Sequence, residues 1–302
     1  MKTLPPKNLF ILFLTALIWG TAFVAQAVGM DHIGPFAFNA ARSFVGGAAL
    51  IPVIFFFNRF KTDGQRQQER ANQKTLILGG VCCGLALGVA SCLQQVGIKY
   101  TTVGKAGFIT AMYIVIVPIL GIFLGKRVGL KLWISVAIAI AGLYLLCMSG
   151  TLTLQKGDLL VILCAIAFSV HILVIDHFSP KVDGVKMSCV QFFVAGLLSL
   201  AVMLLFEGAP AARDVALSWA PILYCGVLSS GVAYTLQIIG QKGVNPTIAS
   251  LVLSLESVIS VLAGWVILGQ SMTGRELLGC VLMFAAIVLA QLPEHSGQEE
   301  TA

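Results

Sequence analysis

The sequence predicts an all-α polytopic membrane protein of ten transmembrane helices, arranged as two inverted five-helix repeats. Composition gives the first observation, because 58% of the 302 residues are hydrophobic and 11% are charged, with a mean hydropathy of +0.95. Long apolar runs and an internal repeat give the other two. A soluble domain carries about 25% charged residues. Most of this surface therefore faces lipid, which excludes soluble enzymes and secreted disulfide scaffolds.

Ten apolar runs are each long enough to cross a hydrocarbon core of about 30 Å as a helix. They span about 9–29, 35–57, 75–97, 104–125 and 131–149 in the first half, and about 157–177, 185–206, 217–240, 247–268 and 274–291 in the second. Turn-forming residues separate them, as at Gly34 and Pro35 or at Asn245 and Pro246. The polar segment 58–74 is expected to be a solvated cytoplasmic hairpin without chemistry.

The basic residues predict the orientation. With the N-terminus in the cytoplasm, thirteen Lys and Arg lie inside, five lie outside and Arg42 lies within a span, which accounts for all 19. The positive-inside rule therefore favours cytoplasmic termini, in a bacterial inner membrane. The net charge of +6 does not indicate nucleic acid, because the basic residues are spread between apolar runs.

The N-terminal run also mimics a signal peptide, with Lys2 and Lys7 before it and a small-residue motif at Ala25 to Ala27. The repeat favours a permanent first helix, because the first span has a partner in the sixth. GVASCLQQVGIK from Gly88 and GVAYTLQIIGQK from Gly231 share seven of twelve residues at an offset of 143.

Upstream of that segment, an offset of 149 pairs Trp19 with Phe168 and Arg42 with Gln191. The chain therefore divides into two units, 1–150 and 151–302. Because each unit has five spans, the second crosses the membrane in the opposite sense. Inverted repeats around a site near the midplane are typical of secondary transporters.

Arg42, His171 and Glu256 are the ionisable residues placed deep within spans, where such groups are costly and often functional. Glu256 is a candidate for a coupling proton or for contact with a substrate ammonium group, with a structural partnership as the alternative. Arg42 either reaches the outer interface, pairs with Glu256, or binds a substrate carboxylate. For His171, hydrogen-bonded packing is favoured over a proton relay.

Gln94 and Gln237 are repeat partners, and they are candidates for two gates or for interhelical amide hydrogen bonds. Aromatic and polar residues are candidates for the walls of a cavity, with simple packing as the alternative. The predicted translocation pathway comprises Trp19, Arg42, Gln94, Tyr113, His171, Tyr234, Gln237 and Glu256, with Gln26 and Thr110 as further wall candidates. No metal or cofactor is expected, since all eight Cys lie within apolar runs and no CxxC occurs.

Three spans carry features that affect packing. Gly80, Gly84 and Gly88 form a face on which another helix can approach closely. Pro118 removes a backbone hydrogen bond and permits a kink. Serines at 250, 254 and 257 give the ninth span a small polar face, suited to packing or to a water-filled cavity.

Several strings resemble EamA-type transporters of the drug/metabolite transporter superfamily, over nearly the whole chain: ALIWGTAF from Ala16, AARSF around Arg42, LGIFLGKRV after Pro118, and SLESVISVLAGWVILGQ from Ser254. The resemblance implies a central cavity lined mainly by helices 1, 3, 4, 6, 8 and 9, with helices 5 and 10 at the periphery. It also implies export of amino acids, other metabolites or drugs. Ser257 stands where the family often has Pro, so we expect a less kinked ninth helix.

The predicted function is therefore secondary transport of a small metabolite by alternating access, as an exporter, in a monomer or weak homodimer, with protons as the candidate coupling ion. A lipid flippase of the same fold is the alternative. An intramembrane enzyme is disfavoured because HExxH and GxSxG are absent, and no P-loop supports the use of ATP.

Overall fold

Apolar runs of helical length become helices throughout the structure, a computed structural model that describes residues 4–101, 103–126, 128–147, 156–268 and 273–292. These residues are predominantly helical and contain no strand. Seven helical segments among them are long and apolar enough to cross a membrane, and shorter apolar helices accompany them. The chain is therefore an integral, multi-pass membrane protein.

Five of the spanning segments are single helices: α1 (Pro6–Gly29), α2 (Pro35–Asn58), α4 (Gln73–Tyr100), α8 (Lys156–Phe178) and α9 (Gly184–Phe206). The other two are built from pieces, α5 (Val103–Ala111) with α6 (Tyr113–Phe123), and α11 (Trp219–Leu223) with the π-helix η1 (Tyr224–Tyr234) and α12 (Thr235–Gln241). The remaining apolar helices are α7 (Leu130–Cys147), α13 (Pro246–Leu253) with α14 (Leu255–Leu268), and α15 (Gly274–Gln291). Helix therefore occupies each of the predicted spans.

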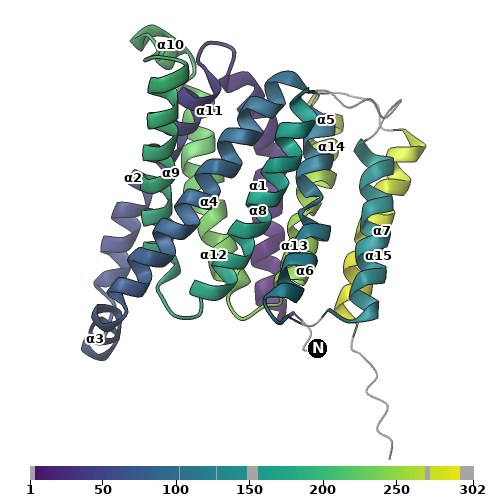
Figure 1. Cartoon of the computed structure of the whole chain (residues 1–302), viewed down its shortest axis with the longest axis horizontal. Helices are drawn as coiled ribbons and strands as arrows, with labels where there is room; N and C mark the ends of the chain where they lie inside the picture. The colour runs from purple at the N-terminus through teal and green to yellow at the C-terminus, as the bar shows by residue number, and fades with distance from the viewer. Residues whose placement is uncertain (1–3, 102, 127, 148–155, 269–272, 293–302) are drawn as a thin grey trace, which may run out of the picture.

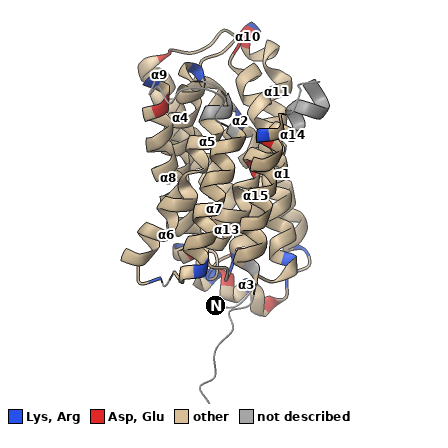
Figure 2. Cartoon of the chain, turned by 90° about the vertical axis from the view of Figure 1, so that its right-hand side faces the viewer, with Lys and Arg blue, Asp and Glu red and all other residues tan. Residues whose placement is uncertain are grey.

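The helices run side by side, and the two ends of the bundle differ (Figure 1). The short helix α3 (Asp63–Ala71) lies at the end where α1 begins and α15 ends, here called the α3 end. The short helix α10 (Ala212–Leu217) lies at the opposite end, the α10 end. Figure 2 shows that charged residues gather near these two ends, as expected for a bundle whose middle faces hydrocarbon.

The predicted glycine face of α4 is confirmed as a packing face. A Cβ atom at Gly84 would lie 2.6 Å from Val194 Cβ, and one at Gly80 would lie 2.6 Å from Val190 Cβ. Because no side chain separates them, α4 and α9 pack closely. At one edge of the bundle, α7 and α15 pack against each other in the same way, with Gly142 against Gly279 (Figure 1).

Two spans are interrupted near their middle. In the first, a tight turn at Met112 separates α5 from α6, because the Met112 N–H bonds to Ile109 O at 3.1 Å and the Val115 N–H bonds to Met112 O at 3.0 Å. In the second, Ser254 separates α13 from α14. The ninth span is thus interrupted without a proline, and the expectation that it is less kinked than in the family stays a prediction.

Serine hydroxyls account for the second interruption. Ser250 donates to the Thr247 carbonyl at 2.9 Å and Ser254 donates to the Leu251 carbonyl at 2.7 Å. Such bonds compete with the helical ladder, which explains an interruption at this position.

The polar segment 58–74 is more ordered than a simple hairpin, because it contains α3. Thr62 and Gln65 form a capping box, in which the Thr62 hydroxyl accepts from the Gln65 N–H and the Gln65 side chain accepts from the Thr62 N–H. An ion-pair cluster ties α3 to the start of α9. Lys61 pairs with Glu69 and, at 2.7 Å, with Asp183, while Lys186 pairs with Glu69 at 2.8 Å.

Candidate functional site

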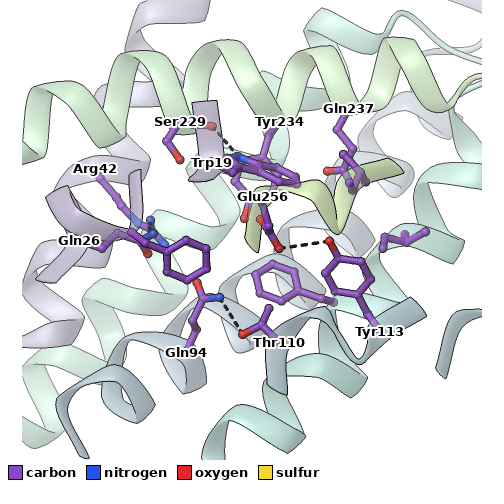
Figure 3. Close-up of a pocket in the computed structure, with 14 residues that line it drawn as sticks. Trp19, Gln26, Arg42, Gln94, Thr110, Tyr113, Ser229, Tyr234, Gln237 and Glu256 are labelled. Carbon is purple, nitrogen blue, oxygen red and sulfur yellow. Dashed lines mark hydrogen bonds between the residues drawn. The ribbon is translucent and has the colours of Figure 1, made fainter. Parts of the chain in front are cut away.

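A small closed cavity lies in the middle of the bundle, and side chains from seven spans surround it (Figure 3). Its volume of about 30 Å³ leaves room for roughly two water molecules. The fourteen lining residues are Trp19, Phe23, Gln26, Arg42, Gln94, Thr110, Tyr113, Phe168, Ile172, Ser229, Tyr234, Gln237, Leu253 and Glu256. They come from helices 1, 3, 4, 6, 8 and 9 of the predicted numbering, and from α2, which adds Arg42.

Glu256 lies in the first turn of α14, directly after the interruption at Ser254, and it is 5% exposed. The Tyr113 hydroxyl, at the start of α6, donates to Glu256 Oε1 at 3.2 Å. An acidic residue in the first turn of a helix is stabilised by the unpaired N–H groups and the helix dipole. The two helix interruptions therefore bring a carboxylate and a phenol together at the cavity.

Arg42 is 4% exposed and does not reach the outer interface. Its Nε donates to Asn39 Oδ1 at 2.8 Å and its Nη1 donates to Gln26 Oε1 at 3.0 Å. Asn39 is itself held by Ser199, since its Nδ2 donates to Ser199 Oγ at 2.8 Å. Neutral oxygens therefore orient the guanidinium group, and the ion pairs among the described residues include none between Arg42 and Glu256.

Aromatic residues form one wall of the cavity. Trp19 and Tyr234 lie with ring centroids 4.5 Å apart, and the Trp19 Nε1–H donates to the Ser229 carbonyl at 3.3 Å. Ser229 and Tyr234 both belong to η1, and π-helical turns occur frequently at functional sites. This wall is suited to an apolar or aromatic part of a ligand.

Gln94 and Gln237 line the same cavity rather than opposite ends of the bundle. Gln94 Nε2 donates to Thr110 Oγ1 at 3.3 Å, whereas Gln237 Oε1 has no partner among the described residues. His171 does not line the cavity. It lies behind Tyr234, at 5.9 Å between ring centroids, and its Nε2 lies 3.1 Å from Gln191 Oε1.

The offsets of the predicted repeat pair most of the residues that line the cavity, including residues that we did not select from the sequence. Ten of the fourteen lining residues form five pairs at the repeat offsets of 149 or 143: Trp19 with Phe168, Phe23 with Ile172, Gln94 with Gln237, Thr110 with Leu253, and Tyr113 with Glu256. Phe23, Phe168, Ile172 and Leu253 were missed because single apolar residues look like packing. Their offsets from the selected residues were the signal that could have identified them.

A multi-pass helical bundle that surrounds a cavity with buried polar and charged side chains has the architecture of a membrane transporter. The EamA-like transporter family matches residues 7–148 and again residues 155–292. The chain belongs to this family.

Known proteins of similar sequence are named as transporters. An uncharacterized transporter of Archaeoglobus fulgidus is 30% identical, over 93% of this chain and 84% of its own length. A probable terminal-alkyne amino-acid exporter of Streptantibioticus cattleyicolor is 23% identical, over 94% and 93%. One crystal structure superimposes with a TM-score of 0.76 at 19% identity, covering 94% of this chain and 96% of the other, which shows a shared fold.

Proposed function

We propose that this chain is a secondary transporter that exports an amino-acid-like zwitterion from the bacterial cytoplasm by alternating access. One observation carries the proposal. A single cavity contains a buried cation, Arg42, and a buried carboxylate, Glu256, and no ion pair among the described residues joins them. A free amino acid presents the complementary carboxylate and ammonium groups, so it satisfies both at once.

Each group has a role in this proposal. Asn39 and Gln26 accept from Nε and Nη1 of Arg42 and hold the guanidinium group in place, and in this proposal it binds the substrate carboxylate. Glu256, steadied by Tyr113, accepts the ammonium group. Trp19 and Tyr234 pack against the amino-acid side chain. The name of the Streptantibioticus cattleyicolor relative, an amino-acid exporter, supports the substrate class.

Alternating access follows from the proposed pair of inverted repeats, 1–150 and 151–302. Three observations support the repeats: the family matches the chain twice, the cavity lining is paired at the repeat offsets, and α1 begins at the α3 end whereas α8 begins at the other (Figure 1). A cavity of about 30 Å³ is too small for an amino acid, so this is a closed state. The interruptions at Met112 and Ser254 give hinges at which half-helices can move.

Glu256 is the proposed site of the coupling proton. It is the acidic residue of the cavity lining, and a carboxylate inside a membrane bundle is a typical proton carrier. Release of the ammonium group outside would let Glu256 take up a proton, which then returns inward as the empty carrier reopens. In this scheme proton and substrate share one carboxylate and move in opposite directions.

Transport by purified protein in liposomes tests the proposal. Vesicles loaded with L-amino acids should release one class of them without ATP, faster when a pH gradient is imposed, as measured by mass spectrometry of the medium. Glu256→Gln should abolish the response to the pH gradient, while Asp31→Asn, which changes an exposed carboxylate, should not.

Two results would count against the proposal. Gradient-driven release that survives Glu256→Gln would remove the proton role of that residue. Movement of a fluorescent phospholipid between leaflets, with no solute flux, would instead support a flippase.

A further inference from the structure

The side chains that fill the two ends of the bundle differ in polarity. Above the cavity, at the α10 end, lies a cluster of apolar side chains: Phe23, Ile98, Ala106, Ile109 and Val161, with Met30 and Phe108 packed against it. We call this cluster the outer seal. The buried polar side chains one helical turn from it are hydrogen-bonded, since Asp158 accepts from the Thr101 hydroxyl at 2.7 Å and Gln95 Nε2 donates to the Gln26 carbonyl at 3.2 Å.

The repeat offsets identify the residues that occupy the equivalent positions at the α3 end. Five of the seven are also apolar: Leu12, Ile172, Ala249, Leu251 and Val252. The other two are polar, because Gln241 stands in place of Ile98 and Ser179 stands in place of Met30. The α3 end therefore has the same framework with two polar exchanges.

Both exchanged side chains carry a buried polar atom that lacks a partner. Gln241 is fully buried and Ser179 is 1% exposed. Gln241 Nε2 donates to the Ile172 carbonyl at 2.6 Å, but Gln241 Oε1 and Ser179 Oγ have no hydrogen-bonding partner among the described residues. Buried polar atoms are nearly always satisfied by protein or by water, because leaving one unsatisfied is costly.

Buried polar atoms without a partner also occur between these two residues and the central cavity. His171 Nδ1 and Gln237 Oε1 are also buried and without a partner among the described residues, and Gln237 lines the cavity. Four of the five such atoms in the described structure therefore belong to α8, to α12 or to the residue that follows α8. The fifth, Gln95 Oε1, belongs to α4.

A surface pocket lies at the α3 end, next to the chain neighbours of two of these residues. The pocket has a volume of about 280 Å³ and is lined by Pro180, Lys181 and Lys242, among others. Pro180 follows Ser179 in the chain, and Lys242 follows Gln241. Ser179 and Gln241 therefore lie one residue from the lining of this pocket, and Gln237, one turn before Gln241, lines the cavity that contains Glu256.

The helices are also packed more closely at the α10 end than at the α3 end. At the α10 end two glycines allow direct backbone contact between α4 and α8, since a Cβ at Gly157 would lie 2.8 Å from the Gly97 carbonyl oxygen. The equivalent positions at the α3 end are Gly240 and Asn8. There the Asn8 side chain stands between α1 and α12, and its Nδ2 donates to the Gly240 carbonyl at 2.8 Å.

We propose that a hydrated route between α8 and α12 connects the central cavity to the solvent at the α3 end, while the outer seal stays dry. Water along Ser179, Gln241 and Gln237 supplies the partners that these side chains lack. In the proposed orientation this end faces the cytoplasm, so Glu256 exchanges protons with the cytoplasm in the closed state. Only this last consequence rests on the proposed function.

Radiolytic hydroxyl-radical footprinting of the full-length protein in lipid nanodiscs tests the route, because it labels side chains that lie beside ordered water. In the wild type, Leu12 should be labelled, whereas Val161, which stands at the equivalent position in the outer seal, should not; both are fully buried and neither lines the central cavity. Gln241→Ile, which copies the outer seal, should reduce labelling of Leu12 to background. Ile98→Gln, the matched exchange at the other end, should introduce labelling at Val161.

Equal labelling of Leu12 and Val161 in the wild type would overturn the proposal, and so would unchanged labelling of Leu12 in Gln241→Ile. If Gln241→Ile does not fold, the wild-type comparison and Ser179→Ala, which should lower labelling beside the pocket, remain decisive. The experiment needs no substrate. A dry α3 end would therefore leave the transport proposal standing, and an absence of amino-acid flux would leave the hydrated route standing.

Discussion

Replacement of Arg42 is the sharpest test of how the cavity recognises a ligand. The guanidinium group is held by Asn39 and Gln26, so the wild-type group is fixed in orientation before a ligand arrives. Hydrogen bonds to charged groups contribute about 1.5–3 kcal/mol each. Loss of two such bonds to a ligand carboxylate would remove at least about 3 kcal/mol, which corresponds to on the order of 100-fold in apparent Kd.

The assay compares two ligands on each protein. Equilibrium binding of an L-amino acid and of its decarboxylated amine would be measured on purified wild type and on Arg42→Gln, by scintillation proximity. The wild type should bind the amino acid on the order of 100-fold more tightly than the amine, and Arg42→Gln should bind the two about equally. The preference of Arg42→Lys for the amino acid over the amine should lie between those of the wild type and Arg42→Gln, because an ammonium group keeps the charge and loses the planar fork.

The ratio of the two ligand affinities separates an effect on recognition from an effect on folding. Arg42→Gln leaves Asn39 Oδ1 and Gln26 Oε1 without their donor, at a cost of about 1–3 kcal/mol each, so some loss of stability is expected whatever the function. Lower stability weakens both ligands alike and leaves their ratio unchanged. An unchanged preference for the amino acid in Arg42→Gln would therefore refute the role of Arg42. Arg275→Gln, which changes an arginine stacked on Tyr144 outside the cavity, is the matched control.

Three further predictions concern the surroundings of the site. Asn39→Leu should weaken amino-acid binding by roughly fivefold, because one hydrogen bond of about 1 kcal/mol that orients Arg42 is lost, while Arg42 itself still favours the amino acid over the amine in the same assay. Gly157→Val should destabilise the protein by about 1–3 kcal/mol, since its side chain would overlap the α4 backbone, whereas Gly64→Ala, with open space around it, should leave the thermal midpoint unchanged. Asp183→Asn should lower the midpoint at neutral pH. Burial raises the pKa of Asp183, but the hydrogen bonds from Lys61 and the Lys186 N–H and the charges of both lysines hold it below its usual 3.8. The wild-type advantage should therefore persist above that pH and shrink as the pH falls further, in a scan of melting temperature against pH; an advantage that does not shrink as the pH is lowered would contradict the ion-pair cluster.

Patterns of local sequence were sufficient for much of the architecture. Apolar runs marked the helical spans because a membrane helix must satisfy its backbone internally, whatever its neighbours. The spacing of Gly80 and Gly84 predicted close packing because it depends on one helix face alone. Thr62 and Gln65 also carried a visible capping box, but the polarity of the segment suggested a hairpin, so the helix α3 was missed.

Features that depend on which of several possible hydrogen bonds forms were harder to predict. The interruption at Ser254 was not predicted, because Pro is the familiar cause of a break and the sequence has none there, whereas the Ser250 and Ser254 hydroxyls bond to their own backbone. The partner of Arg42 was equally inaccessible, since Asn39 and Gln26 satisfy it only because α1 and α2 lie at a particular angle and depth. Repeat offsets held more information about the cavity than residue type did.

The contact between Tyr113 and Glu256 has a geometric consequence in the proposed inverted-repeat arrangement. The two residues are 143 positions apart, the offset of the segment from Gly88 and one less than the 144 that relates Gly125 to Gly269, so they occupy equivalent positions to within one residue, and they hydrogen-bond to each other. Positions exchanged by a two-fold axis can touch only if both lie beside that axis. Glu256 is then equally distant from both ends of the bundle, so an exchange of conformation between the halves would carry it from one solvent to the other with little movement of its own. Because the neighbouring side chain is a phenol rather than a second acid, one proton per cycle can be carried there, and in the proposed scheme it is taken up outside and released to the cytoplasm, the side on which the hydrated route lies.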